Sequence, residues 1–144
     1  MRPSRDQYFL GLAHAAAERS TCGRLKVGAV LVDRLGRILS TGYNGSPSGY
    51  AHCAELHCNL DEPCQWSVHA EINALLFSEN REPQKTLYVT ASPCRSCALA
   101  IANAGVGRVV VARAFRTEVG VSGLEVLKRG HIIVEQMAPG TEMV

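Results

Sequence analysis

Two short clusters of metal-binding side chains lie within the stretch from Val68 to Ala98. His69 and Glu71 form the first cluster, and Cys94 and Cys97 form the second. One imidazole and two thiolates are ligands that Zn²⁺ prefers, and three protein ligands leave a fourth coordination position for water. A chain that uses all four groups must fold so that the two clusters meet. This requirement constrains the fold more than any other feature of the sequence.

Each cluster is predicted to lie at the start of a helix. Residues two apart on a helix point apart, so His69 and Glu71 can serve one site only from the first turn of a helix that ends against the metal, and the segment 68–79 has the pattern of such a helix. Cys94 and Cys97 share one helix face, and Pro93 favours a helix start just before them. The positive end of a helix dipole also favours the thiolate that a metal needs. We therefore expect two helix starts to flank one zinc ion.

The order His-X-Glu followed by Pro-Cys-X-X-Cys indicates catalysis. Zinc-bound water ionises near neutral pH, and the Glu71 carboxylate can carry the displaced proton to a leaving group. By itself, the Cys-X-X-Cys pair is also typical of a redox dithiol or of half a structural zinc site. Together with His69 and Glu71 it has the signature of zinc enzymes that deaminate nucleobases. The reaction that we expect is hydrolytic deamination.

Composition narrows the class of protein. A chain of 144 residues with 47% hydrophobic content is predicted to form one domain, 1–144. We find no secretory signal pattern and no apolar run near the roughly 18 residues that span a bilayer, so we expect a cytoplasmic protein without membrane contact. In that compartment, six cysteines indicate metal binding more than disulfides. The net charge of +2 without a long basic run argues against a polynucleotide partner and leaves room for a small anionic ligand.

Local patterns predict alternating helices and strands. A capping box of Ser4 and Gln7 starts a first helix, whose apolar stripe contains Phe9, Leu12 and Ala13. A hairpin follows, with both strands mostly in the core, and then a long functional loop. Alternation after the loop predicts a mixed sheet with helices on both faces. The expected ranges are strands 26–33 and 37–43, loop 44–66, helix 68–79, strand 86–90, helix 94–104, strand 108–112, helix 119–129, strand 132–136 and a tail 137–144.

The chain resembles the cytidine deaminase superfamily and, within it, the deoxycytidylate (dCMP) deaminases. The motifs that carry the resemblance are RSTCGRLKVGAVLV, GYNGSPSGYAHC, VHAEINAL and PCRSCALAIANAGV. The resemblance implies that His69, Cys94 and Cys97 bind the catalytic zinc and that Glu71 moves protons. It also implies an α/β fold of the cytidine deaminase type, a three-layer α/β/α sandwich with a five-stranded mixed sheet. A homo-oligomer, often a hexamer, and allosteric regulation by dCTP and dTTP are further implications.

Four residues are candidates for substrate binding. Asn44 and Asn73 occupy motif positions at which dCMP deaminases resembling this chain place amides that contact the nucleotide. Asn44 is equally typical of a turn before Gly45, and Asn73 of a helix surface. Arg24 and Lys26 precede the first strand and are candidates for phosphate contacts, although basic residues in such places are often only solvated.

The other four cysteines are candidates for a second, structural zinc site. Relatives with such a site take ligands from segments equivalent to those holding Cys22 and Cys53, and Cys58 and Cys64 are inferred to complete the set. Four thiolates would close a tetrahedral site. The alternative is that these are ordinary buried cysteines.

These observations predict zinc-dependent deamination of dCMP to dUMP and ammonia, which supplies dUMP for thymidylate synthesis. Two alternatives stay open. One is a deaminase of dCTP or of a 5-substituted dCMP, because the tolerance at C5 of the base cannot be deduced from these motifs. The other is a zinc- or nucleotide-binding protein without catalysis, which the complete set of His69, Glu71, Cys94 and Cys97 argues against.

Overall fold

The computed structural model describes residues 1–55, 61, 64–113 and 118–137. These parts contain four α-helices, five strands and one 3₁₀ turn. In chain order they are α1 (Arg5–Ala17), β1 (Gly28–Val32), β2 (Ile38–Tyr43), η1 (Cys53–Glu55), α2 (Ala70–Leu76), β3 (Lys85–Val89), α3 (Arg95–Asn103), β4 (Val106–Val111), α4 (Gly123–Arg129) and β5 (Ile133–Gln136).

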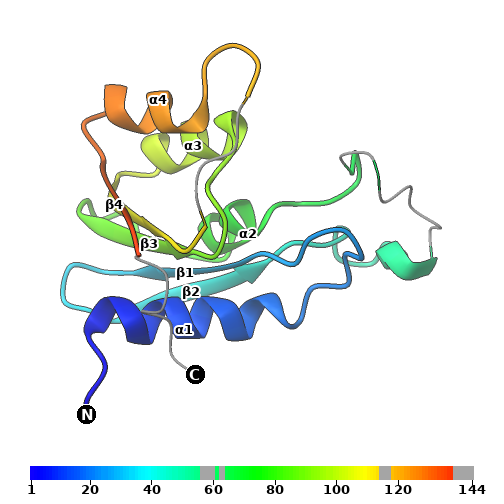
Figure 1. Ribbon diagram of the computed structural model, residues 1–144, viewed down its shortest axis with the longest axis horizontal. Helices are drawn as coiled ribbons and strands as arrows, with labels where there is room; N and C mark the ends of the chain where they lie inside the picture. Colours follow the sequence, from blue (N-terminus) through cyan, green and yellow to red (C-terminus); the bar gives the residue numbers. More distant parts are fainter. Residues whose placement is uncertain (56–60, 62–63, 114–117, 138–144) are drawn as a thin grey trace.

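The strands form one mixed sheet in the order β2-β1-β3-β4-β5. β1 runs antiparallel to both β2 and β3, whereas β3, β4 and β5 are parallel. α1 covers one face of the sheet, and α2, α3 and α4 cover the other (Figure 1). This is the predicted three-layer α/β/α sandwich with a five-stranded mixed sheet, so the fold class is confirmed.

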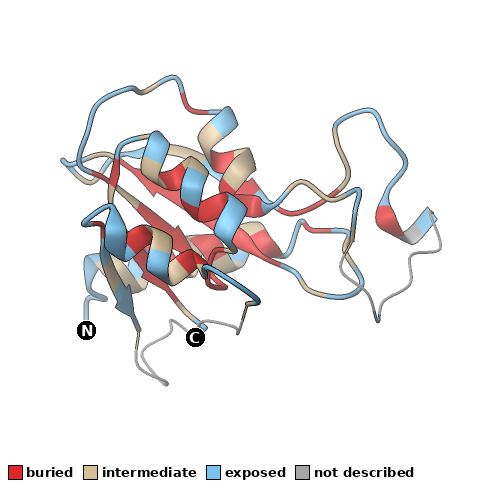
Figure 2. Cartoon of the chain, turned by 90° about the horizontal axis from the view of Figure 1, so that it is seen from above, coloured by how far each residue is buried: buried red, intermediate tan, exposed pale blue. Residues whose placement is uncertain are grey.

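Alternating strand residues supply the cores on the two faces of the sheet. Val30 packs with Phe9 and Leu10 of α1, while its neighbour Leu31 belongs to the core beneath α2 and α3. Successive side chains of a strand point to opposite faces, so a strand covered on both sides is apolar throughout. The buried residues accordingly lie along the sheet and on the helix sides that face it (Figure 2).

An ionic network fastens the start of α1 to the sheet. The Asp6 carboxylate accepts hydrogen bonds from the Tyr88 hydroxyl at 2.7 Å and from Arg108 Nη2 at 2.6 Å. Arg108 also donates to Glu135 through Nε at 3.0 Å. These hydrogen bonds lower the pKa of Asp6, with the Arg108 bond as the largest cause. The network connects one helix with three strands, on the face of the sheet opposite α2.

Three elements differ from the sequence prediction. β2 is not mostly core, because it is an edge strand and only Gly42 in it is buried. The second helix ends at Leu76 and does not continue to residue 79. The fourth helix begins at Gly123, capped by the Ser122 side chain, and not at Val119. None of the helices in the described parts has the length and apolarity that crossing a bilayer requires.

Candidate active site

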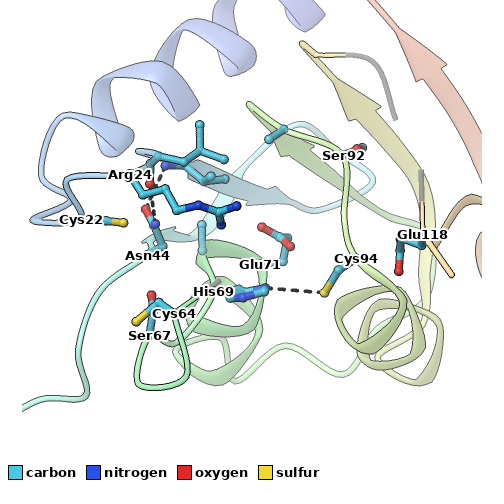
Figure 3. A pocket seen from close by; sticks show the side chains of 14 residues that line it. Cys22, Arg24, Asn44, Cys64, Ser67, His69, Glu71, Ser92, Cys94 and Glu118 are labelled. Carbon is cyan, nitrogen blue, oxygen red and sulfur yellow. Dashed lines mark hydrogen bonds between the residues drawn. The ribbon is translucent and has the colours of Figure 1, made fainter. Parts of the chain in front are cut away.

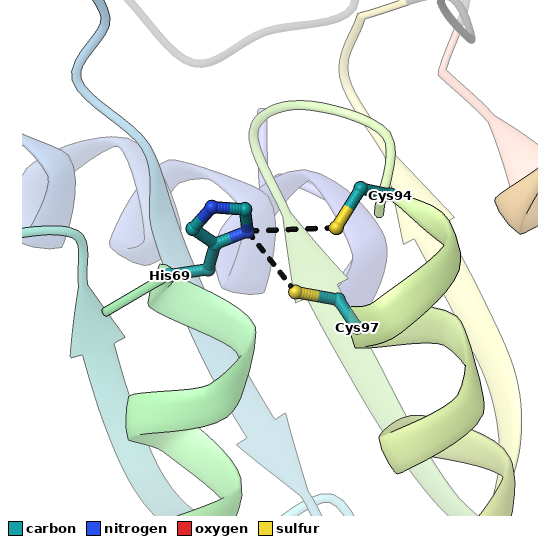
Figure 4. A group of neighbouring side chains, drawn as sticks. All are labelled: His69, Cys94 and Cys97. Atoms are coloured by element: carbon teal, nitrogen blue, oxygen red, sulfur yellow. Dashed lines mark hydrogen bonds between the residues drawn. The ribbon is translucent and has the colours of Figure 1, made fainter. Parts of the chain in front are cut away.

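His69, Cys94 and Cys97 converge at one point. His69 Nδ1 lies 3.2 Å from Cys97 Sγ and 3.6 Å from Cys94 Sγ (Figure 4). A tetrahedral zinc ion with bonds of about 2.1 to 2.3 Å separates its ligand atoms by roughly 3.4 to 3.8 Å. The three side chains therefore fit zinc. Among the described residues, they are the one group of three potential metal ligands whose atoms lie within 4.8 Å of one another.

Two helix starts carry this cluster, as the sequence predicts. His69 is the N-cap of α2 and Cys94 is the N-cap of α3, so both lie one residue before their helices. Neither side chain caps its own helix, which leaves the imidazole and the thiol directed at each other. Gly42 of β2 holds the start of α2 close to the sheet: a Cβ there would lie 2.3 Å from the Ala70 carbonyl oxygen, so only glycine fits.

The loop between β2 and α2 is closed at its base. Gly45 and Val68 pair across an antiparallel bridge, with N–H to oxygen distances of 3.1 and 2.8 Å. This bridge brings Asn44 beside His69, although 25 positions separate them. Within the described part of the predicted loop 44–66, η1 is the one helical element.

The two thiols have opposite pKa shifts. Hydrogen bonds from Cys97 and His69 lower the pKa of Cys94 to about 3. The same thiol pair and burial raise the pKa of Cys97. A metal ion bound to both sulfurs would displace any thiol proton, so metal binding would depend on pH. This environment suits a metal site, because thiolates are the ligand form.

Glu71 is a buried carboxyl beside the cluster. The residue is only 4% exposed, and burial is the largest cause of its raised pKa, which a hydrogen bond with Cys97 partly opposes. A carboxyl beside a reacting water can serve as general base and general acid. Its position next to three metal-binding side chains is the arrangement that the sequence predicts for a proton carrier.

A cavity of about 320 Å³ opens over these groups (Figure 3). Its size falls near the lower end of the range of roughly 300 to 1,000 Å³ for small-molecule sites. It lies at the carboxyl end of β3, where ligands bind in many α/β proteins. The residues that line it are Cys22, Arg24, Leu25, Val27, Asn44, Cys64, Ser67, His69, Ala70, Glu71, Ala91, Ser92, Cys94 and Glu118.

Asn44 is 8% exposed and holds one wall of the cavity together. Its Oδ1 accepts from the Val27 amide at 2.8 Å, and its Nδ2 donates to the Leu25 carbonyl at 2.7 Å. An amide oxygen accepts two hydrogen bonds and an amide nitrogen donates two, so among the described residues one acceptor position and one donor of Asn44 stay open to a ligand. The role of Asn44 as a substrate contact stays a prediction.

The other predicted residues separate into two groups. Arg24 lines the cavity and extends its guanidinium towards the side of Glu71, and Cys22 and Cys64 also line it (Figure 3). Lys26, Asn73 and Cys53 are not among the lining residues. The Asn73 amide instead donates to the Tyr43 carbonyl at 2.8 Å. Cys58 lies outside the described residues.

Sequence reasoning did not identify Ser67, Ser92 or Glu118, which also line the cavity. Ser92 could have been found, since it directly precedes the Pro-Cys-X-X-Cys motif. Glu118 has no such signal, because it lies 24 positions after Cys94 and belongs to no motif.

Comparison with known proteins identifies the family. The family described as "Cytidine and deoxycytidylate deaminase zinc-binding region" matches residues 3–113, the greater part of the chain. This chain belongs to that family. Deoxycytidylate deaminase of Mycobacterium phage D29 is 46% identical to this chain over 123 residues. The matched region covers 76% of this chain and 94% of the phage protein. ComE operon protein 2 of Bacillus subtilis is 39% identical over 140 residues, which cover 94% of this chain and 72% of the Bacillus protein.

Solved structures of this deaminase family agree with the fold. The dCMP deaminase of cyanophage S-TIM5, solved in complex with dCMP and dUMP, superposes with a TM-score of 0.81 at 34% identity. The superposition covers 95% of this chain and 99% of the cyanophage chain. The zinc-binding character of the family agrees with the ligand cluster of His69, Cys94 and Cys97.

Proposed function

We propose that this protein is a zinc-dependent enzyme that hydrolyses dCMP to dUMP and ammonia, and so supplies dUMP for thymidylate synthesis. The observation that carries the proposal is the convergence of His69, Cys94 and Cys97 beside the buried Glu71 in a cavity of nucleotide scale. The similarity to deoxycytidylate deaminases along most of the chain supports the choice of substrate.

Each group has a role in this reaction. His69, Cys94 and Cys97 would hold the zinc ion, which lowers the pKa of water towards neutrality and so supplies the nucleophile. Glu71 would take a proton from the attacking water and deliver it to N3 of the cytosine. It would then take a second proton from the new C4 hydroxyl and deliver it to the leaving amine. Burial keeps this carboxyl beside the proposed metal ligands and raises its pKa, which favours its protonated form relative to an exposed carboxyl.

Arg24 is the proposed phosphate contact. It is the one Lys or Arg among the described residues that line the cavity, and its guanidinium extends into the cavity (Figure 3). A guanidinium recognises phosphate oxygens through charge-assisted hydrogen bonds. Lys26 is exposed and outside the cavity lining, so it is the weaker of the two candidates. Asn44 would use its remaining donor and acceptor on the sugar or the base. Asn73 would contact the substrate through the amide groups that its bond to the Tyr43 carbonyl does not use.

Ammonia release tests this function and its alternatives together. Purified protein is incubated with dCMP, dCTP, deoxycytidine and 5-methyl-dCMP, and the four kcat/KM values are compared. We expect dCMP to exceed deoxycytidine by about ten- to a hundredfold, the equivalent of a charge-assisted contact of roughly 1.5 to 3 kcal/mol. Preference for dCTP or for the methylated nucleotide would select the first alternative. No release from any of them, at full zinc content, would select the non-catalytic one.

We also propose a second zinc ion, held by Cys22, Cys53, Cys58 and Cys64, that orders the loop after β2. Residue type and the position of Cys22 and Cys64 on one cavity support it. Because Cys22, Cys53 and Cys64 form no group of ligand atoms within 4.8 Å of one another in the described part of the chain, the proposal requires these side chains to move together around the ion. Structural zinc contributes roughly 10 to 16 kcal/mol in small zinc-dependent domains, enough to order a loop with few apolar residues. Elemental analysis should give two zinc ions per chain, and about one in Cys58→Ser. One ion per chain in freshly prepared wild type would refute this second site.

Finally, we propose a homo-oligomer, with a hexamer as the assembly that family resemblance implies, regulated by dCTP and dTTP. Large apolar side chains exposed on the helical layer support association: Leu76 is 68% exposed, Phe77 71% and Leu99 56%. Sedimentation of wild type and of Phe77→Glu measures the assembly, and activity with added dCTP or dTTP measures regulation. A monomer at micromolar concentration would exclude the oligomer.

A further inference from the structure

The N-cap residue of α3 is Cys94, and its side chain does not cap the helix. The first N–H groups of a helix have no partner inside the helix and need acceptors from elsewhere. An N-cap side chain usually provides one, but the Cys94 sulfur is directed at His69 and makes no capping bond. A metal ligand in this position leaves the helix start without its local acceptor.

Glu118 supplies that acceptor from another part of the chain. Its Oε2 accepts from the Arg95 amide at 3.1 Å, in the first turn of α3. Its Oε1 accepts from the Gly123 amide at 3.0 Å, in the first turn of α4. One carboxylate thus joins the starts of two helices, and both are places where a negative charge is favourable.

Two further contacts hold the same junction. The Arg95 side chain returns to the segment after Glu118, where Nη1 donates to the Val119 and Val121 carbonyls at 3.1 and 3.2 Å. Gly123 also lies against the ligand loop, because a Cβ there would be 2.2 Å from the Pro93 carbonyl oxygen. The backbone on either side of Cys94 is therefore fixed by the segment 118–123.

We propose that Glu118 is a positioning residue for the metal ligand Cys94. The inference rests on the proposed role of Cys94 and extends it. With both oxygens bonded to backbone amides, Glu118 holds the α3 start so that the Cys94 thiolate stays directed at the metal. Groups that support metal ligands from outside typically change metal affinity about 10- to 100-fold when removed.

Zinc retention tests the inference without depending on turnover. Zinc-loaded wild type, Glu118→Ala, Glu118→Gln and Glu125→Gln are mixed with a chromogenic chelator, and the rate of zinc release is followed. Glu125 is an exposed residue of α4 and provides the matched change. We expect release about 10- to 100-fold faster in Glu118→Ala, wild-type release in Glu125→Gln, and an intermediate rate in Glu118→Gln, which keeps one acceptor.

Two additional measurements distinguish positioning of the metal ligand from ordinary capping of α3 by Glu118. In cobalt-substituted protein, the thiolate-to-metal absorption should shift in Glu118→Ala, which loss of an ordinary helix cap would not cause. Wild-type zinc release and cobalt absorption in that variant, whatever its thermal midpoint, would overturn the inference. Should Glu118→Ala fail to fold, Glu118→Gln decides by the same criteria. Cys94→Ser tests separately whether Cys94 is a zinc ligand. Wild-type zinc release in that variant would reject this assignment, and with it the inference that Glu118 positions Cys94.

Discussion

Replacing Glu71 by Gln separates proton transfer from metal binding. The carboxamide has the size and shape of the carboxyl, and its oxygen can keep the hydrogen bond with Cys97. Because Glu71 is 4% exposed, the substitution also removes a charge that is costly to bury. We therefore expect the zinc content to be unchanged and the thermal midpoint to be unchanged or higher.

The cavity indicates how large the kinetic effect should be. General acid–base catalysis contributes about 10²- to 10⁴-fold to rate, or roughly 2.7 to 5.5 kcal/mol. The residues lining the cavity include two carboxylates, Glu71 and Glu118. Glu118 is held at the starts of α3 and α4 by a backbone amide on each oxygen, so we do not expect it to replace Glu71 as a proton carrier. We therefore expect a loss of kcat towards the upper half of that range, on the order of 10³-fold or more.

Ammonia release from dCMP, measured beside elemental analysis and a thermal melt, provides the test. Glu79→Gln is the matched control, because Glu79 is exposed and lies just after α2. His69→Ala is the opposite case and should lose the metal. Near-normal turnover in Glu71→Gln at full zinc content would show that the assignment of roles is wrong, and loss of zinc from that variant would show that Glu71 acts in metal binding.

Two further predictions concern the phosphate and the stability of the fold. Arg24→Ala should lower kcat/KM for dCMP about ten- to a hundredfold and leave deoxycytidine unaffected, with Arg34→Ala in the β1–β2 turn as control; equal losses on both substrates would exclude a phosphate contact. The Arg108 hydrogen bond lowers the pKa of Asp6 below its ordinary 3.8, so the carboxylate stabilises the fold above that pH and this contribution is lost as pH falls through the lowered pKa. Urea unfolding should therefore show a stability gap between wild type and Asp6→Asn at pH 7 that closes below about pH 4, and a gap independent of pH would refute this account.

The sequence by itself determined the chemistry of the site. Ligand identity is a property of single residues, and the spacings of His69 to Glu71 and of Cys94 to Cys97 are short enough for local helix geometry to decide which groups can act together. Helix–strand alternation likewise implied a mixed sheet, because parallel strands need crossovers. These local signals predicted helix starts at residues 68 and 94, and the helices begin within two residues of those positions, at Ala70 and Arg95.

Only the tertiary structure decided which distant groups join that site. Arg24 enters the cavity and Lys26 does not, although they are two residues apart, because that choice depends on how the segment before β1 lies over the sheet. Strand composition did not reveal that β2 is an edge, since exposure follows from strand order. Glu118 reaches the start of α3 only through the packing of α4 against it, a contact between segments more than 20 positions apart. Such contacts depend on the whole fold, and no local pattern in the sequence predicts them.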